Sequence, residues 1–204
     1  VALLPPHPAL PPSRVQTWSV STLVCSMFAA QPLPGLPPYG PKALSFPEAG
    51  AFSEGFVVEF NSDGEKWVGN FAYGWGDGPN SVHTQLGAHS VFVVAEGAGY
   101  LIDAATRNLI RELGPDLQMV LFLEDIRAFV VSDGLGFEAF DALRTVWRSR
   151  RVSWDGIRDL SYKGRVMSGE AYDPTCAGDW LPFSLDLITV EVTGGSYTCG
   201  AWST

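Results

Sequence analysis

The sequence predicts an all-β fold of repeated antiparallel meanders. The main observation is a segment that occurs twice: Phe92-Val-Val-Ala-Glu-Gly-Ala-Gly-Tyr100 returns 37 residues later as Phe129-Val-Val-Ser-Asp-Gly-Leu-Gly-Phe137. Recurrence at a period of this size is typical of proteins built from small repeated sheets. The composition agrees, because 46% of the 204 residues are hydrophobic, 12% are aromatic and only 17% are charged.

Each copy of the repeated segment predicts a β-hairpin. The Phe-Val-Val run is aromatic and β-branched, which suits a buried strand. An acidic residue and a glycine then form a tight turn, because glycine reaches positive φ without steric cost. A second strand begins with Tyr100 in one copy and Phe137 in the other. Chance similarity between two ordinary hairpins is the alternative interpretation.

From Ser45 onward the chain divides into four units of about 37 residues. The first contains Phe56 to Tyr73, the second and third are the two copies described above, and the fourth runs from Val152 to Val192. Four such units predict a small β-propeller or a propeller-like barrel. A β-sandwich made of the same meanders is the alternative.

Two segments resemble propeller blades of known families. The segment Phe60-Asn-Ser-Asp-Gly-Glu-Lys-Trp67 is similar to the Ser-Pro-Asp-Gly-Lys-Trp turn of TolB-like propellers. Residues 99–113 resemble the Leu-Asp-Ala-x-Thr-Gly hairpin of quinoprotein propellers, although Arg107 stands where that family has its turn glycine. These resemblances imply strand-turn-strand geometry. They carry over neither a quinone cofactor nor dehydrogenase activity.

Proline divides the chain into two regions. Eleven of the fifteen prolines precede residue 48, which disfavours helix and central sheet there. We interpret residues 1–43 as a proline-rich N-terminal arm with one strand over Val15–Cys25, and residues 44–204 as the β-repeat domain. We expect that strand to pair with the last sheet, as in ring-like propellers; a flexible linker and a polyproline ligand are the alternatives.

The net charge of −9 and the pI near 4.7 make nucleic acid an unfavourable partner, because an acidic surface repels phosphate backbones. A basic partner is favoured electrostatically. The sequence contains no run of about twenty apolar residues, so it predicts no membrane-spanning helix. We expect a soluble protein, in the cytoplasm rather than secreted.

The cysteines predict neither a metal site nor a cofactor site. Cys25, Cys176 and Cys199 include no Cys-x-x-Cys pair and no histidine at ligand spacing. Free buried thiols are favoured, and a bridge between Cys176 and Cys199 is the alternative in an oxidising compartment.

No catalytic motif stands out, and the catalytic residues, if any, are unknown. We interpret the histidines, His7, His83 and His89, as structural. Glycoside chemistry needs two carboxyl groups that face each other across a cleft. The candidate acids are Glu124, Asp125, Asp155, Asp159, Glu170, Asp173, Asp179 and Asp186. Asp155, Asp173 and Asp179 occupy turn contexts, which favour a structural role. The basic cluster of Arg148, Arg150 and Arg151 predicts ion pairs with Asp155 or Asp159.

One segment suggests a binding site. Residues 71–80, Phe-Ala-Tyr-Gly-Trp-Gly-Asp-Gly-Pro-Asn, alternate aromatic residues with glycine. This pattern places Tyr73 and Trp75 on a mobile loop, where they would stack on a sugar or fill a pocket of a partner, with Asp77 and Asn80 adding polar contacts. The alternative is a loop that folds its aromatic side chains inward.

The sequence therefore favours a non-enzymatic β-scaffold that binds a protein or peptide. A carbohydrate-active hydrolase or lyase with paired carboxylates is one alternative. A structural assembly component whose proline arm docks on a neighbouring copy is the other.

Overall fold

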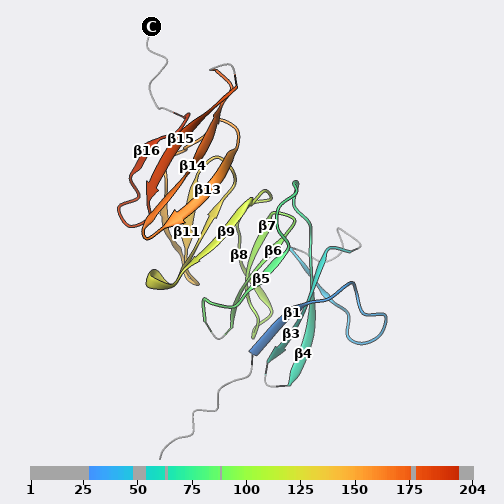
Figure 1. The fold of residues 1–204 in the computed structure, drawn as a ribbon. Helices are drawn as coiled ribbons and strands as arrows, with labels where there is room; N and C mark the ends of the chain where they lie inside the picture. Colours follow the sequence, from blue (N-terminus) through green and yellow to red (C-terminus); the bar gives the residue numbers. More distant parts are fainter. Residues whose placement is uncertain (1–27, 48–53, 63, 88, 176–177, 198–204) are drawn as a thin grey trace, which may run out of the picture.

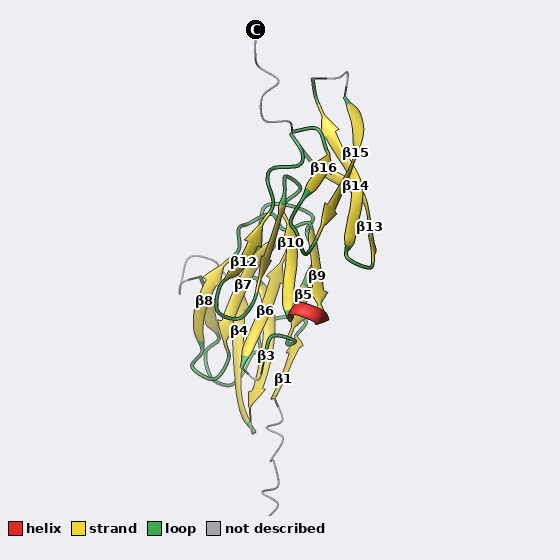
Figure 2. Cartoon of the chain, turned by 90° about the vertical axis from the view of Figure 1, so that its left-hand side faces the viewer, coloured by secondary structure: helices red, strands yellow, loops and turns green. Residues whose placement is uncertain are grey.

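The computed structural model describes residues 28–47, 54–62, 64–87, 89–175 and 178–197. In this part of the chain, sixteen strands form four sheets of four strands each, and the one helical element is the short 3-10 turn η1 (Glu124–Ile126). The sheets follow one another along the molecule in sequence order (Figure 1), and η1 is the only helix among the strands of Figure 2. The predicted all-β fold of repeated meanders is confirmed.

Sheet 1 includes one strand from the predicted proline-rich arm, β1. It contains β1 (Phe28–Pro32), β2 (Leu44–Phe46), β3 (Phe56–Ser62) and β4 (Glu65–Phe71), in the order β1-β3-β4-β2. Strand β2 runs parallel to β4, whereas the other neighbours are antiparallel. The described N-terminal strands thus pair with the first sheet. The strand predicted over Val15–Cys25 lies outside the described residues.

Sheets 2, 3 and 4 are antiparallel meanders, in which each strand pairs with the next one along the chain. Sheet 2 consists of β5 (Ser81–His83), β6 (Ser90–Ala95), β7 (Ala98–Asp103) and β8 (Asn108–Glu112). Sheet 3 consists of β9 (Met119–Leu123), β10 (Ala128–Ser132), β11 (Phe137–Phe140) and β12 (Thr145–Arg148). Sheet 4 consists of β13 (Ile157–Lys163), β14 (Val166–Asp173), β15 (Asp179–Asp186) and β16 (Val192–Gly194).

The two similar segments form the β6–β7 and β10–β11 hairpins, as predicted, but their turns differ in length. In the first hairpin Ala95 pairs with Ala98 across a two-residue turn. In the second, Ser132 pairs with Phe137 across four residues, because the Asp133 carboxylate accepts hydrogen bonds from two backbone N–H groups and forms a wider turn. Phe137 therefore occupies the register position of Ala98, and the expected match with Tyr100 is displaced by two residues.

Three apolar interfaces hold the sheets together, one between each pair of consecutive sheets. Aromatic side chains dominate the first two: the ring centroids of Phe71 and Tyr100 lie 5.5 Å apart between sheets 1 and 2, and those of Phe92 and Phe129 lie 5.2 Å apart between sheets 2 and 3. The third, between sheets 3 and 4, includes Phe183. No buried cluster of the described residues joins sheet 4 to sheet 1. The four sheets thus form an open, propeller-like array and not the pair of sheets that defines a sandwich.

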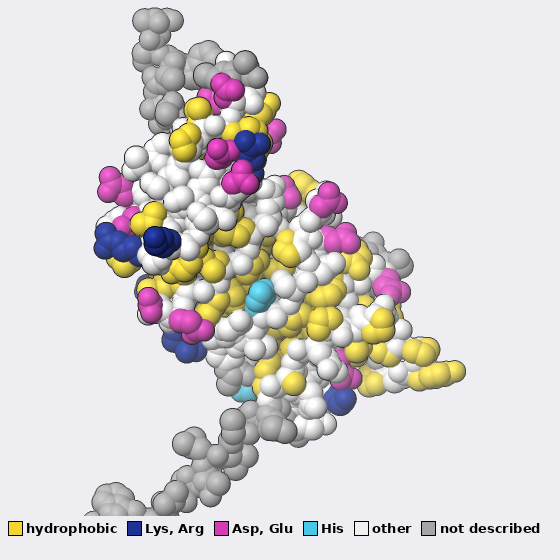
Figure 3. Space-filling view, viewed as in Figure 1, with side chains coloured by type: hydrophobic (Ala, Val, Ile, Leu, Met, Phe, Trp, Pro, Cys, Tyr) yellow, Lys and Arg dark blue, Asp and Glu magenta, His cyan; other side chains and the backbone are white. Residues whose placement is uncertain are grey.

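Burial differs between the inner and the outer sheets. Strands β6 and β10 are almost completely buried because sheets 2 and 3 are covered on both faces, whereas β13 is mostly exposed. The outward face of sheet 1 has the ion pair Glu59–Lys66, and that of sheet 4 has Arg158–Glu170. On the face shown in Figure 3, uncharged side chains fill the middle of the molecule, and charged ones gather toward its periphery.

Candidate binding site

The connection from sheet 1 to sheet 2, residues 72–80, is the segment singled out in the sequence, and we name it the glycine-aromatic loop. Its residues alternate in exposure. Tyr73 is 45% exposed and Trp75 is 86% exposed, and Asp77 is exposed as well. The aromatic side chains therefore point to solvent, and the alternative in which they fold inward is not what the structure shows.

The glycines of this loop lie against the turn of the β6–β7 hairpin. A Cβ atom at Gly74 would overlap the carbonyl oxygens of Glu96 and Pro115. One at Gly78 would lie 2.5 Å from the backbone nitrogen of Gly97. Because the backbones approach too closely for side chains on this side, every second residue of the loop must direct its side chain outward.

Hydrogen bonds anchor the glycine-aromatic loop along its length. The N–H of Gly74 donates to the carbonyl of Ala95 at 2.9 Å, and that of Trp75 donates to the carbonyl of Pro115 at 2.9 Å. Asn80 Oδ1 accepts from the N–H of Glu96 at 2.9 Å. The loop expected to be mobile is thus tied to sheet 2 and to the connection that follows it. Because Oδ1 of Asn80 is used within the chain, its amide nitrogen is the part of that side chain that a ligand can contact.

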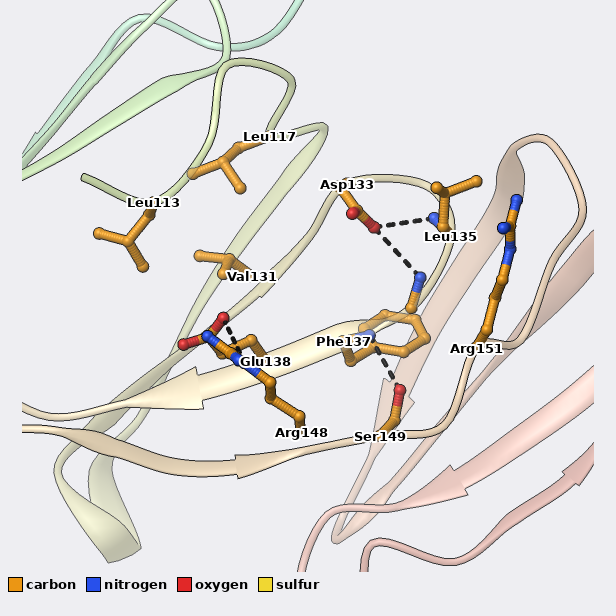
Figure 4. Close-up of a pocket in the computed structure, with 11 residues that line it drawn as sticks. Leu113, Leu117, Val131, Asp133, Leu135, Phe137, Glu138, Arg148, Ser149 and Arg151 are labelled. Atoms are coloured by element: carbon orange, nitrogen blue, oxygen red, sulfur yellow. Dashed lines mark hydrogen bonds and ion pairs between the residues drawn. The ribbon is translucent and has the colours of Figure 1, made fainter.

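A cleft of about 410 Å³ lies beside this loop, between sheets 2 and 3 (Figure 4). The connection from β8 to β9 separates the two features: Leu117 lines the cleft, and its carbonyl oxygen lies against Gly78. The lining residues come from three segments of the chain: Leu113, Leu117, Val131, Asp133, Leu135, Gly136, Phe137, Glu138, Arg148, Ser149 and Arg151.

Glu138 is the most strongly engaged acid of the cleft. Its carboxylate accepts hydrogen bonds from Arg111 at 3.1 Å, Thr145 at 2.7 Å and Arg148 at 3.0 Å. Burial would by itself raise the pKa of Glu138, but the hydrogen bonds from Thr145 and Arg148 and the charges of Arg111 and Arg148 lower that pKa below its ordinary value. Glu138 is therefore ionised at neutral pH and is not suited to act as a general acid.

The second acid of the cleft, Asp133, has a structural role in the β10–β11 turn. Its Oδ1 accepts from the N–H groups of Leu135 at 2.9 Å and Gly136 at 3.2 Å. Figure 4 shows these two bonds on one side of the cleft. Neither Asp133 nor Glu138 is among the acids proposed from the sequence for glycoside chemistry.

The expected ion pairs of the basic cluster are not formed. Arg148 pairs with Glu138, and Arg158 is the residue that pairs with Asp159. Arg151 instead donates to the carbonyl oxygens of Ser153 at 2.8 Å and Trp154 at 2.6 Å. Backbone carbonyls satisfy these donors because the connection from sheet 3 to sheet 4 folds around the guanidinium groups.

An aromatic pair lies behind Arg151. Trp154 and Tyr197 meet edge to face with their centroids 4.6 Å apart. The Arg151 guanidinium lies 4.8 Å from the Tyr197 ring and 5.8 Å from the Trp154 ring. These contacts fix the guanidinium at the edge of the cleft.

Other sequence candidates lie elsewhere. His83 stacks on Phe92 with the ring centroids 5.8 Å apart and does not line the cleft. Within the described ranges, no three His, Cys, Asp or Glu side chains are grouped so as to hold a metal ion, and no helix there is long and apolar enough to cross a membrane. Cys25, Cys176 and Cys199 lie outside the described residues.

The chain matches no family model and no curated protein sequence. Solved structures similar to it include BamB from Moraxella catarrhalis, at 17% identity and a TM-score of 0.44, covering 67% of this chain and 42% of that one. The extracellular domain of a putative one component system from B. thetaiotaomicron is 13% identical, with a TM-score of 0.42, covering 67% and 21% of the two chains. A eukaryotic initiation factor is 10% identical, with a TM-score of 0.37, covering 70% and 40%. The chain matches less than half the length of each, and these similarities assign no family.

Proposed function

We propose that the protein is a non-catalytic module that binds a protein or peptide segment through the glycine-aromatic loop and the adjacent cleft. The observation that carries this proposal is the position of Trp75, which is 86% exposed on a backbone that cannot turn it inward. A soluble protein gains nothing in folding energy from a large apolar side chain held in water. The gain comes when a partner covers it.

Burial of this short loop by a partner would contribute a large binding free energy. Burial of a large apolar side chain contributes about 1.5–3 kcal/mol. Truncation of a central Trp or Tyr in an interface costs about 2 kcal/mol or more. Because hydrogen bonds hold the loop in place, little conformational entropy is lost when a partner binds.

The cleft supports binding rather than catalysis. Both of its carboxylates are engaged by internal donors, Glu138 by two arginines and Asp133 by backbone N–H groups. A pair of acids working on a glycoside needs one carboxyl that is protonated at the working pH. The low pKa of Glu138 opposes that role.

The test is selection of dodecapeptides displayed on phage against the immobilised full chain, followed by measurement of the dissociation constant of each selected peptide. We expect Trp75→Ser combined with Tyr73→Ser to weaken binding at least about thirtyfold, the equivalent of about 2 kcal/mol. Leu143→Ser is the matched control, because Leu143 is 90% exposed at the β11–β12 turn, away from the loop.

Two results would contradict the proposal. Selected peptides that bind the Tyr73 and Trp75 variant as tightly as the unmodified chain would place the binding site elsewhere. Absence of any enriched peptide, together with Trp75-dependent binding on a glycan array, would replace the peptide with a carbohydrate.

A further inference from the structure

We propose that the cleft between sheets 2 and 3 holds an apolar side chain of the bound peptide, and that Arg148 at its rim binds a carboxylate next to that side chain. This inference rests on the proposed function and names the chemistry that the site selects. The carboxylate can belong to an Asp or Glu side chain or to the C-terminus of the peptide, and the experiment below separates these sources.

The apolar half of the site is formed by both sheets. Leu113 and Leu117 approach from the end of sheet 2, and Val131 and Phe137 approach from β10 and β11 (Figure 4). Leu117 and Val131 belong to the core between sheets 2 and 3, and Phe137 belongs to the core between sheets 3 and 4. All three are nearly buried, so the floor of the cleft is fixed. A volume of about 410 Å³ lies in the range of sites that take small ligands or single side chains.

Both acids of the cleft already accept hydrogen bonds from within the chain, which reduces their attraction for a cationic ligand. Glu138 lies between two guanidinium groups, with Arg111 Nη2 at 3.1 Å from Oε1 and Arg148 Nε at 3.0 Å from Oε2. Its negative charge is thus more than balanced by these two cations. Oδ1 of Asp133 accepts two backbone hydrogen bonds within the β10–β11 turn.

Arg148, in contrast, keeps free donors. Among the described residues, Arg148 makes a hydrogen bond only through Nε, which leaves both terminal nitrogens available on a side chain that is 69% exposed. Arg151 lies on the opposite side of the cleft, where it donates through Nε and Nη2 to the carbonyl oxygens of Ser153 and Trp154 (Figure 4). Guanidinium groups bind carboxylates with charge-assisted, frequently bidentate hydrogen bonds, so the unused donors of Arg148 match an anion.

The local charge also differs in sign from that of the whole chain. The chain has a net charge of −9, yet four of its thirteen basic residues lie between positions 144 and 151. At physiological ionic strength charges are screened over about 8 Å, so a ligand in the cleft responds to these arginines more than to distant acids. The basic partner favoured by the net charge alone is therefore not the ligand that this cleft selects.

The experiment uses fluorescein-labelled octapeptides based on the peptides selected with the full chain, measured by fluorescence anisotropy. One pair carries an internal Leu-Asp or Leu-Asn, and a second pair ends in Leu with a free carboxylate or an amide. We expect the carboxylate member of one pair to bind about tenfold more tightly than its neutral counterpart. The pair that shows the difference identifies the source of the carboxylate.

Substitutions in the chain link the preference to Arg148. Arg148→Gln should reduce the carboxylate preference to near unity while the chain stays folded, because Arg111 still neutralises Glu138. Thermal unfolding of the variant is followed in parallel. Arg144→Gln is the control, because Arg144 is an exposed cation of the same segment that does not line the cleft.

Equal affinity for the charged and neutral peptides would overturn this inference. So would an Arg144→Gln variant that loses the preference as fully as Arg148→Gln does, since the effect would then be general electrostatics. In both cases Trp75-dependent peptide binding would leave the proposed function standing, whereas loss of all Trp75-dependent peptide binding would overturn the function itself.

Discussion

Gly74 shows at the level of a single residue how the exposed aromatic side chains are held. Its Cα faces the carbonyl oxygens of Glu96 and Pro115, and a side chain there would force the loop away from the hairpin turn. We expect Gly74→Ala to lower the free energy of unfolding by about 1–3 kcal/mol, the usual cost of overpacking. Urea denaturation measures the change.

Gly76 provides the control for this substitution. A Cβ atom at Gly76 would meet only Asp116 Oδ1, at 2.8 Å, and that flexible side chain can move aside. Gly76→Ala should therefore change stability much less. Equal losses in the two variants would show that the loss of glycine flexibility, and not the close contact of backbones, is responsible.

The residues of the site differ in how visible they are in the sequence. The alternation of glycine with Tyr73, Trp75 and Asp77 is a local pattern, and the three side chains are exposed as this pattern indicates. Their contact with a partner stays a prediction. The cleft has no local signature, because residues as distant in sequence as Leu113 and Arg151 come to line it only after two sheets pack against each other. The cluster of arginines before residue 152 is the one sequence feature that pointed to this cleft. The ion pairs that it predicts, with Asp155 or Asp159, are not formed.

At the scale of single elements, strands β6 and β10 were predictable because both faces of each are covered. A run of apolar residues without alternation is typical of such strands. The length of the following turn was not predictable from the shared acid-glycine pair. Asp133 organises a four-residue turn by binding two N–H groups, whereas Glu96 and Gly97 complete a two-residue turn with positive φ at both positions.

Strand β5 contributes a pH-sensitive element. The His83 ring lies 5.8 Å from Phe92 and 5.1 Å from Phe129 between centroids, and burial lowers the pKa of its imidazole below the ordinary 6.5. The unfolded chain then takes up a proton at a higher pH than the folded one. The stabilisation is complete above about pH 6.5 and is lost as the pH falls through the lower pKa of the folded state.

We expect His83→Gln to remove this part of the acid sensitivity. Chemical denaturation of the unmodified chain and of His83→Gln between about pH 7.5 and pH 5 measures it, as the difference in unfolding free energy at each pH. His89→Gln, at an exposed histidine, is the matched control. An unchanged slope in His83→Gln would show that other groups cause the loss.

For the whole molecule, the open array has a consequence for cooperativity. Among the described residues, each buried cluster joins one sheet to the next, as in linear repeat proteins, where stability is close to a sum of units and interfaces. Phe183 joins sheet 4 to sheet 3, and its ring lies 5.8 Å from that of Phe137. Phe183→Ala should cost about 3–5 kcal/mol at this interface.

Hydrogen exchange can locate the effect of that substitution. We expect faster exchange in residues 157–186 and little change in residues 56–71. Phe60→Ala, at the interface of sheets 1 and 2, should produce the reverse distribution. A uniform rise in exchange across all four sheets would contradict the linear arrangement and indicate one cooperative unit.

The number of sheets could be predicted from the sequence, but ring closure could not. Closure depends on whether the outward faces of sheets 1 and 4 are apolar, and those faces carry Glu59, Lys66, Arg158 and Glu170. The mixed composition of β13 reflects this, although its pattern is weak because a register shift interrupts its pairing with β14. A polar outer face on a terminal unit is what keeps a stacked array soluble.

The glycines and the exposed residues of the glycine-aromatic loop have different roles, and this difference determines which positions can be substituted during evolution. Gly74 and Gly78 are needed for the fold, whereas Trp75 and Asp77 contribute little to it because their side chains lie in solvent. New side chains at those two positions would alter what the loop recognises without a stability penalty that must be compensated elsewhere. The loop is therefore a position at which specificity can diverge, by natural variation or by directed evolution, on an unchanged scaffold.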